Sequence, residues 1–183
     1  VLHQNPQVNG IIHSAGIHSD GGIGQKTVDD LQKVLAAKIA GTFNLDLLTR
    51  ERNLDFMVLF SSVSAAFGNP GQADYASGNA FMDGFAAWRN AQVRKGKRYG
   101  KTLSVNWPLW EKGGMSLTDT QRDLMRQTMG GQPMSTEDGL AAFYQLFHPN
   151  HDQVLVLHGD LKKLKRFAVT GSATTKLSVI LAK

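Results

Sequence analysis

The sequence predicts an α/β fold in which a parallel sheet is covered by helices on both faces. Short apolar runs of strand length alternate along the chain with longer stretches whose apolar residues recur at helical spacing. The short runs are largely apolar throughout, which is typical of parallel strands buried on both faces. This regular alternation of strand and helix indicates a doubly wound sheet with crossover helices.

The first half of the chain contributes two expected strands and two long expected helices. Val8–His13 is the first strand, and a glycine-rich loop follows it. Thr27 opens a T-x-x-D capping box, which starts a helix that continues to about Thr49. Leu54–Ser61 is the second strand, and residues 74–95 form a long helix with small residues along one side.

The second half of the chain contributes the remaining elements. In order, they are a strand over Thr102–Trp107, an amphipathic helix over 116–129, a capped helix over 135–146 and a last strand over Gln153–His158. Beyond Phe167 the sequence becomes rich in Thr, Ser and Gly, which is typical of a linker. We therefore expect a folded part over residues 1–167 and a linker or tail over 168–183.

The composition is that of about one ordinary globular domain. The chain has 183 residues, 42% of them hydrophobic, and no apolar run approaches the about 20 residues that a membrane-spanning helix needs. It has no cysteine, so no disulfide framework or thiolate metal site is expected, and a cytosolic setting fits. His148 and His151 have no third ligand nearby in the sequence, so we expect no metal site.

The net charge of +5 is concentrated in two basic clusters. One surrounds the end of the long central helix, and the other lies near the C-terminus; their members are Arg89, Arg94, Lys95, Lys97, Arg98 and Lys101, and Lys162, Lys163, Lys165 and Arg166. Cations are favoured at helix C-termini and on solvated surface, which is the simpler explanation, while an acidic partner is the alternative. The nearby aromatic residues form no stacking pattern, so we expect no nucleic-acid partner.

Three polar side chains have the chemistry of a carbonyl-reducing site. Ser62 leaves the end of the second strand, and Tyr75 opens the long helix, with Asn79 one helical turn later. A phenol can give a proton to a carbonyl oxygen, and a second hydroxyl can hold that oxygen in place. Each of these residues by itself is more often a turn or a helix-surface residue, so the prediction depends on their combination.

The combined motifs resemble the ketoreductase domains of modular polyketide synthases, within the short-chain dehydrogenase/reductase superfamily. The details are most similar to synthases whose acyltransferase acts in trans. The matching segments run from about Val8 to Arg166; they are His13–Ile17, Phe60–Ser62, Gly68–Tyr75, Asn79–Asp83 and Asn106–Met115. This resemblance implies a Rossmann-like fold.

The resemblance assigns a catalytic role to four residues. Tyr75 would donate its proton to the ketone oxygen, and Ser62 would hydrogen-bond that oxygen. Lys38, on the preceding long helix, would stabilise the phenolate, because a nearby cation lowers the pKa of a phenol. Asn79 would hold the geometry of Tyr75 and Lys38 or a relay water. Most of the superfamily has lysine where Asn79 stands, and the exchange with Lys38 is the pattern of polyketide and fatty-acid synthases.

The resemblance also implies a nicotinamide cofactor, and specifically NADPH, which members of this family usually bind. Ala15 and Gly16 would line the cofactor together with Lys38 and Tyr75, while Pro108 and Leu109 would lie near the nicotinamide. A dinucleotide fold should open with a strand and a G-x-G-x-x-G phosphate loop, which this sequence lacks. Residues 21–27 are the nearest match but lack the third glycine. We therefore expect an incomplete sheet, without its first strands and phosphate loop.

Substrate-contacting positions follow from the same resemblance. Met115 would lie on the lid over the substrate, and Asp20 and Phe67 occupy positions that mark product stereochemistry. Asp20 matches the last residue of the Leu-Asp-Asp triplet of enzymes that give the D-hydroxy product, although His18 and Ser19 do not match. Phe67 replaces the tryptophan of the opposite class. The sequence thus favours the D-hydroxy product. The alternative is that Asp20 only caps its loop and does not influence the stereochemistry.

Three interpretations of function remain at this point. The first is reduction of a β-keto thioester, carried on the phosphopantetheine arm of an acyl carrier protein, to the β-hydroxy thioester. The second is a non-catalytic half-domain that acts only when an N-terminal half complements it, because the chain lacks an initiator Met and a phosphate loop. The third is a free-standing reductase of small ketones. The missing Met and the lysine-rich segment that leads into the linker argue against it.

Overall fold

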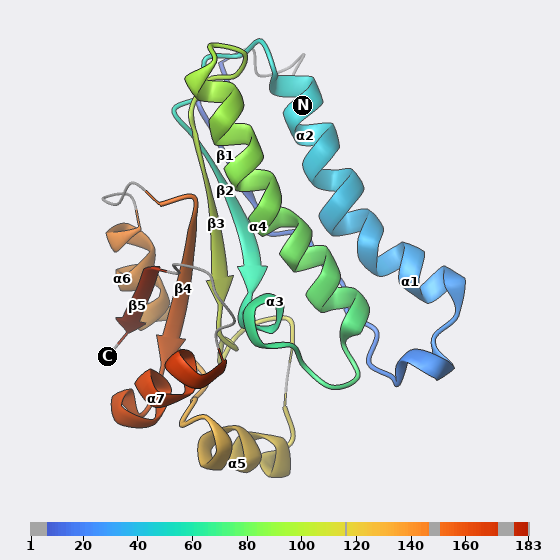
Figure 1. Ribbon diagram of the computed structural model, residues 1–183, viewed down its shortest axis with the longest axis vertical. Helices are drawn as coiled ribbons and strands as arrows, with labels where there is room; N and C mark the ends of the chain where they lie inside the picture. Colours follow the sequence, from blue (N-terminus) through green and yellow to red (C-terminus); the bar gives the residue numbers. More distant parts are fainter. Residues whose placement is uncertain (1–6, 116, 147–150, 172–177, 183) are drawn as a thin grey trace. The chain divides into compact units, whose positions relative to one another are not determined.

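The computed structural model describes residues 7–115, 117–146, 151–171 and 178–182 (Figure 1). The chain divides into two compact units, residues 1–106 and residues 107–183. All four residues of the predicted catalytic set fall in the first unit. The units are therefore described separately, beginning with the first.

Parallel strands form the sheet of the first unit. The strand β2 (Phe56–Ser62) lies between β1 (Gly10–His13) and β3 (Lys101–Trp107). β1 and β2 run parallel, with His13 opposite Leu59. Each expected strand is therefore present, shifted at its ends by a few residues at most. The parallel pairing brings the C-terminal ends of β1 and β2 to the same edge of the sheet.

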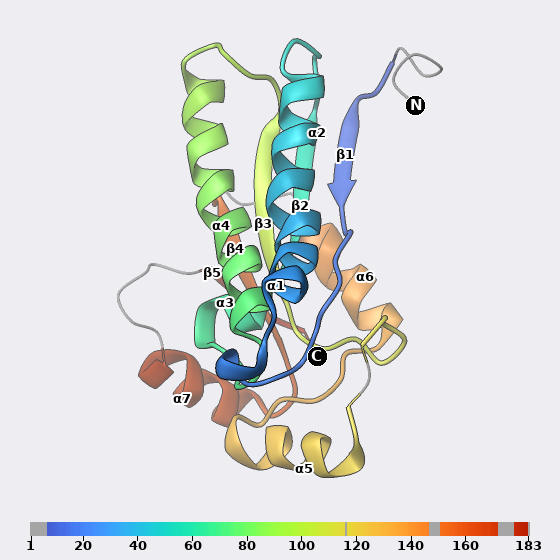
Figure 2. The ribbon, with the colours of Figure 1, turned by 90° about the vertical axis from the view of Figure 1, so that its right-hand side faces the viewer.

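Two long helical segments lie side by side along these strands (Figures 1 and 2). The first consists of α1 (Val28–Leu35), a π-helical segment η2 (Ala36–Ala40) and α2 (Gly41–Thr49). The second is α4 (Ala73–Arg94). The predicted capping box is confirmed, because the Thr27 side chain accepts from the Asp30 amide and the Asp30 side chain accepts from the Thr27 amide. The π-helical interruption was not predicted.

Two short helical turns complete the first unit. The 3₁₀ turn η1 (Ile23–Gln25) lies within the long loop between β1 and α1. The helix α3 (Val63–Phe67) follows β2 directly, and Ser62 is its N-cap residue. Both turns lie next to predicted site residues, and neither was predicted from the sequence.

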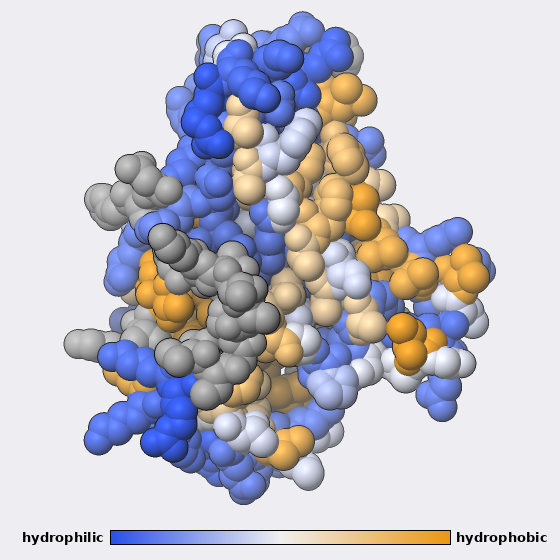
Figure 3. All heavy atoms as spheres, viewed as in Figure 1, coloured by the Kyte–Doolittle hydropathy of each residue, from blue (hydrophilic) through white to orange (hydrophobic). Residues whose placement is uncertain are grey.

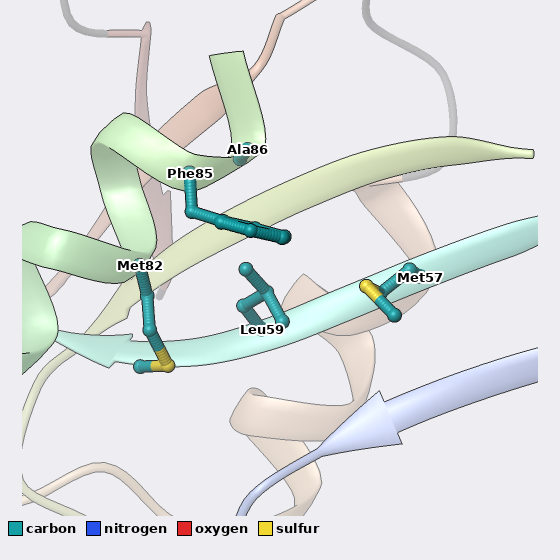
Figure 4. Packing of buried hydrophobic residues seen from close by; sticks show 5 residues of the cluster. All are labelled: Met57, Leu59, Met82, Phe85 and Ala86. Carbon is teal, nitrogen blue, oxygen red and sulfur yellow. The ribbon is translucent and has the colours of Figure 1, made fainter. Parts of the chain in front are cut away.

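The apolar core of the first unit lies between β2 and α4 (Figure 4). Met57 and Leu59 point from the strand toward Met82, Phe85 and Ala86 on the helix, and all five are at most 5% exposed. These side chains recur at spacing two on the strand and at three to four on the helix, as the two periodicities require. The core therefore fixes α4, which carries Tyr75 and Asn79, against the strand that ends in Ser62.

A buried charge cluster fixes the far end of the same helix. Arg89 is fully buried, and its Nε lies 2.9 Å from Asp46 Oδ1. The Arg89 guanidinium also donates to the carbonyls of Tyr99 and Gly100 and to Thr102 Oγ1, each at 2.9 Å. Arg98 binds the second oxygen of Asp46 at 2.9 Å. The expectation of a solvated basic cluster is therefore wrong for Arg89, because this side chain ties α2, α4 and the start of β3 together.

The second unit contains the remaining elements. They are α5 (Asp119–Thr128), α6 (Thr136–Gln145), β4 (Gln153–His158), α7 (Leu161–Gly171) and β5 (Ser178–Ala182). β5 pairs in parallel with β4, with Val156 opposite Ile180. Regular structure thus extends into residues 168–183, so the linker expectation is wrong for the end of α7 and for β5. A composition rich in Thr and Ser does not prevent an apolar strand such as β5 from pairing.

The buried Arg89 gives a stability prediction. Replacing Arg89 with alanine leaves Asp46 buried with one partner fewer, and we expect a loss of about 3–5 kcal/mol in the free energy of unfolding. The matched control is Arg94→Ala on the same helix, which removes an exposed side chain and should change stability by no more than about 0.5 kcal/mol. Urea unfolding followed by circular dichroism measures both, and equal effects would contradict the prediction.

Candidate active site

The structure brings the four predicted catalytic side chains together in the first unit. Lys38 comes from η2, Ser62 from the end of β2, and Tyr75 and Asn79 from the first turns of α4. All four are buried, with exposures of 3%, 8%, 8% and 0%. Buried polar side chains require partners or a ligand, so the contacts of each one decide what the arrangement can do.

Lys38 reaches the site from the π-helical segment. Its Nζ donates to the carbonyl oxygen of Phe60 at 2.8 Å and lies 5.9 Å from the centre of the Tyr75 ring. Two glycines pack against its chain: a Cβ on Gly16 would lie 2.8 Å from Lys38 Cε, and one on Gly78 would lie 3.1 Å from Lys38 Cβ. Small residues at both positions are therefore required for the path of this lysine.

Burial changes the proton affinity of Lys38. It lowers the pKa of the ammonium to about 8, because the charged form loses hydration, while the Asp83 carboxylate partly opposes this shift. Since a lysine with this pKa is mostly protonated at neutral pH, it presents a cation close to the phenol. The expected lowering of the phenol pKa is not seen, however, because burial raises the pKa of Tyr75 and outweighs the groups that oppose it.

His13 lies beside Lys38 at the end of β1. Its Nε2 is 3.1 Å from the carbonyl oxygen of Ala37, within the π-helical segment, and a Cβ on Gly41 would lie 3.3 Å from its ring. Burial lowers the pKa of His13, the Lys38 charge lowers it further, and the Ala37 carbonyl opposes both. A neutral His13 therefore adds no second cation next to Lys38.

The phenol of Tyr75 remains protonated at neutral pH. Burial raises its pKa above the ordinary value, and the Asn79 and Ser62 side chains partly oppose this by stabilising the phenolate. A group with a raised pKa holds its proton until the reaction provides an acceptor. Tyr75 therefore carries the proton that a general acid needs at neutral pH, while its raised pKa makes that proton harder to release.

The Ser62 hydroxyl caps a helix and also has the chemistry to bind a carbonyl oxygen. Its Oγ accepts the Ser64 amide at 3.2 Å and so caps α3. A hydroxyl has one donor and two acceptor positions, so this cap leaves the O–H to hydrogen-bond the Tyr75 side chain. The cap fixes the position of the oxygen, and a carbonyl oxygen that enters the site can take the Ser62 donor in exchange.

Asn79 combines a fixed donor with an unpaired acceptor. Its Nδ2 donates to the Tyr75 carbonyl at 2.8 Å, one turn earlier on α4. Its Oδ1 is buried without a hydrogen-bond partner in the described structure. A buried unpaired oxygen next to Tyr75 indicates a position where a water or a ligand hydroxyl would bind.

A polar network around Asp83 and Asn106 lies next to Ser62 and was not predicted from the sequence. Asp83 accepts from Ser104 Oγ at 2.6 Å and from Asn106 Nδ2 at 2.9 Å. Asn106 Nδ2 also lies 3.0 Å from Ser61 Oγ and from the Ser62 carbonyl. The signal was available, because Thr102, Ser104 and Asn106 are polar residues at spacing two on one face of the strand, and apolar residues alternate with them. The network fixes the backbone that carries Ser62.

The loop after β1 carries the other predicted residues of this unit. Ala15, Gly16 and Asp20 are exposed, so this edge can be approached by a ligand. Asp20 Oδ1 accepts from Gln72 Nε2 at 2.8 Å, immediately before α4. Phe67 is half-buried at the end of α3. Asp20 therefore does more than cap its own loop, because it binds the segment that leads to Tyr75.

Pro108, Leu109 and Met115 belong to the second unit. All three are half-buried. Leu109 and Met115 line a cavity of about 650 Å³, together with Trp110, Arg122 and Pro133 among others. Of the predicted nicotinamide and lid residues, Leu109 and Met115 thus share one hollow within their own unit, while Pro108 is not among its lining residues.

The described residues offer neither a metal site nor a membrane-spanning helix. No group of three or more His, Cys, Asp or Glu side chains in that part of the chain could hold a metal ion, and His148 lies outside it. Among the same residues, no helix is both long and apolar enough to cross a bilayer.

Known proteins resemble this chain over most of its length. The family model described as "KR domain" matches residues 1–112. The polyketide synthases PksN and PksL of Bacillus subtilis (strain 168) are 42% and 47% identical over 93% and 87% of the chain. A crystal structure of a ketoreductase domain from the bacillaene assembly line is 44% identical over 90% of the chain, with a TM-score of 0.86. An N-terminal ketoreductase from the macrolactin assembly line is 38% identical, with a TM-score of 0.78.

These matches confirm the predicted Rossmann-like α/β architecture and the resemblance drawn from the motifs. The chain spans only 3% of PksN and 4% of PksL. It spans 39% of the bacillaene ketoreductase chain and 31% of the macrolactin one.

Proposed function

This chain belongs to the KR domain family, the ketoreductases of polyketide synthases, and we propose that it reduces a β-keto thioester to a β-hydroxy thioester. The observation that carries the proposal is the buried Lys38 ammonium, 5.9 Å from the ring of Tyr75, whose side chain also hydrogen-bonds Ser62. A phenol, a cation and a second hydroxyl are the groups that polarise and protonate a carbonyl oxygen.

Ketoreductases of this superfamily use a nicotinamide cofactor, and the residues present fit one. The unpaired Oδ1 of Asn79 is a buried acceptor in the site, and Lys38 has N–H donors beyond the one that binds the Phe60 carbonyl. Ala15 and Gly16 offer an exposed edge with little side chain, which lets a ligand approach the backbone. From the family resemblance we propose NADPH, which when bound supplies the hydride to the ketone carbon.

The side chains of this chain perform the proton chemistry. Ser62 Oγ–H and Tyr75 Oη–H both donate to the ketone oxygen and so place it between them. As negative charge develops on that oxygen, the Tyr75 proton moves to it and a phenolate remains. The Lys38 ammonium stabilises this phenolate through the low-dielectric interior. Asn79 fixes the first turn of α4 and provides an acceptor for a water that returns a proton to Tyr75.

We predict that Tyr75→Phe removes ketone reduction while the fold survives. The variant loses the transferable proton and keeps the ring that packs in the site, so the rate should fall by roughly 10²–10⁴-fold. The assay follows NADPH oxidation against a β-keto thioester, with the N-terminal half proposed below present. Tyr144→Phe, which alters a phenol 71% exposed on α6, is the control and should retain full activity. Activity of Tyr75→Phe within a few-fold of wild type would reject the assignment.

The pKa of Lys38 gives a second prediction. Because the folded-state pKa is about 8, below the ordinary 10.5, the ammonium is present below pH 8 and is lost as the pH rises through that value. We expect the rate of reduction to fall above about pH 8. Lys38→Arg keeps a charge that does not titrate, so whatever activity it retains should lose this fall.

The control for this pH profile is Lys33→Arg, an exposed lysine of α1, which should leave the profile unchanged. A wild-type rate that stays constant through pH 8 to 10 would contradict the role of Lys38. The same conclusion would follow if Lys38→Arg kept an unchanged alkaline fall.

We further propose that the reaction requires an N-terminal half that supplies the missing strands and phosphate loop, in the same polypeptide or in a second one. Ile12 on β1 is 51% exposed, although parallel strands are usually buried on both faces. An apolar band also runs over the α1–α2 and α4 helices in Figure 3. On α2, Phe43, Leu47 and Leu48 are each at least 50% exposed. The strand β1 suits a partner that extends the sheet, and the apolar helix face suits packing against a protein partner.

This partner proposal predicts that the 183-residue chain by itself binds NADPH poorly. The helix N-terminus that would hold the pyrophosphate is not provided by the segment at residues 21–27, which lacks the glycine pattern. Isothermal calorimetry with the pure chain should therefore detect no binding at micromolar NADPH, and adding the N-terminal half should restore it. Micromolar binding by the lone chain would overturn the proposal.

The second proposed partner is an acyl carrier protein whose phosphopantetheine arm presents the thioester. Asp20 and Phe67 lie on segments next to the Tyr75 helix, so they are placed to influence how that arm enters. The D-hydroxy product stays our expectation for the reaction.

A further inference from the structure

A second buried charge pair of the first unit is not used by the proposed chemistry. Lys26 Nζ lies 2.8 Å from Asp74 Oδ2, and the two side chains are 7% and 0% exposed. Neither residue belongs to the predicted site. Asp74 directly precedes Tyr75, and Lys26 lies in the loop that carries Gly16 and Asp20.

Lys26 holds its own loop in shape. It follows the 3₁₀ turn η1 with an extended backbone, and the capping residue Thr27 comes next. Besides Asp74, its ammonium donates to the backbone carbonyl of Ser19. One cation thus closes the segment from Ser19 to Lys26 and connects it to a different element.

Asp74 holds the start of the catalytic helix. It lies in the first turn of α4, where a negative charge is favoured by the helix dipole. Its Oδ1 accepts the Tyr75 amide at 2.9 Å, while its Oδ2 binds Lys26. The two oxygens of one carboxylate therefore connect the loop after β1 to the backbone of Tyr75.

Two further hydrogen bonds connect these segments, and neither involves a charge on both sides. The Gly21 amide donates to the Gly71 carbonyl at 3.0 Å, and Asp20 accepts from Gln72 in an exposed hydrogen bond. Exposed polar contacts are exchanged readily for contacts with water. The Lys26–Asp74 pair is buried, so removing either side chain would leave the other charge desolvated and without its counter-ion.

A buried ion pair adds little net stability compared with apolar side chains of similar size, yet removing one partner is strongly unfavourable. Such a pair therefore selects one arrangement of two segments over others. Here the two segments are the loop that presents Asp20 and the helix turn that presents Tyr75.

We propose that the Lys26–Asp74 pair is a latch that fixes the loop carrying Gly16 and Asp20 to the first turn of α4, and that it thereby positions the substrate against Tyr75. This role rests on the proposed ketone reduction. Lys26 and Asp74 are positioning residues, because they act through the loop and the Tyr75 backbone. A loosened latch lets the thioester enter in more than one orientation and expose either ketone face to the hydride.

Amide hydrogen exchange tests the latch without using the reaction. In Lys26→Met, the Gly21 amide should exchange at least roughly tenfold faster than in wild type, because the loop opens more often. Asp74→Asn keeps an oxygen that can accept the Tyr75 amide but removes the charge, so it should accelerate Gly21 and leave Tyr75 closer to wild type. The buried β2 amides of Val58 and Leu59 should not change in either variant.

The second measurement is the reaction, with the N-terminal half present. Both variants should lower kcat/KM for a β-keto thioester by roughly ten- to a hundredfold, and raise the share of the minor hydroxy epimer in chiral chromatography. The double variant should be no worse than either single one, because the two residues act as a unit. Lys33→Met, an exposed lysine on α1, is the control and should match wild type in both measurements.

The outcomes separate this inference from the proposed function. Wild-type exchange at Gly21 in both variants would overturn the latch, whatever the reaction does. Acceleration of the β2 amides in both variants would also overturn it, because the pair would then serve the stability of the whole unit. An unchanged epimer ratio despite a mobile loop would overturn its effect on the substrate. If wild type fails to reduce any β-keto thioester, the proposed function falls, and hydrogen exchange still decides the latch.

Discussion

The burial of the Lys38 ammonium beside Tyr75 is the constraint on which the arrangement of the first unit depends. A lysine that is 3% exposed needs hydrogen-bond acceptors, room for its side chain and a neighbouring group that favours its charged form. The Phe60 carbonyl provides an acceptor, Gly16 and Gly78 provide the room, and Asp83 favours the charged form. The helix itself adapts, because Lys38 lies in the π-helical segment Ala36–Ala40 rather than in a regular turn. Such π-bulges are frequent at functional sites.

Three buried or partly buried charge systems are distributed along α4, and each one joins this helix to a different element. Arg89 and Asp46 join the end of α4 to α2, and Lys26 and Asp74 join the start of α4 to the loop after β1. Asp83, in the middle of α4, binds Ser104 and Asn106 on β3. The helix that carries Tyr75 is therefore held by a polar contact near its start, its middle and its end, in addition to the apolar core. Positions held in this way suit a proton donor, because a small displacement of a reacting group lowers the rate strongly.

The exchange of roles between Lys38 and Asn79 has a physical explanation in this structure. Asn79 is fully buried and donates to the Tyr75 carbonyl one turn earlier, which an ammonium could do only at the expense of burying a second charge. The cation instead arrives from η2, where a backbone carbonyl of β2 binds it. The unpaired Oδ1 of Asn79 then remains as an acceptor that the charged residue would not have offered. The site thus has one cation, one acid and one vacant acceptor rather than two competing cations.

Local sequence predicted most strands and the long helices, and three members of the candidate site. The apolar runs predicted the strands, the capping box at Thr27 predicted the start of α1, and Ser62, Tyr75 and Asn79 were close enough in sequence to be recognised together. Lys38 was assigned through family resemblance, because nothing local distinguishes it from an exposed helix lysine. Only the tertiary structure decided that the side chains of Lys38, Arg89 and Lys26 are buried. It also decided which groups bind their charges, since each partner belongs to an element far away in the chain. Burial of a charge is a property of the packed elements around it, and periodicity in one segment contains no information about the carboxylate or carbonyl that another segment will provide.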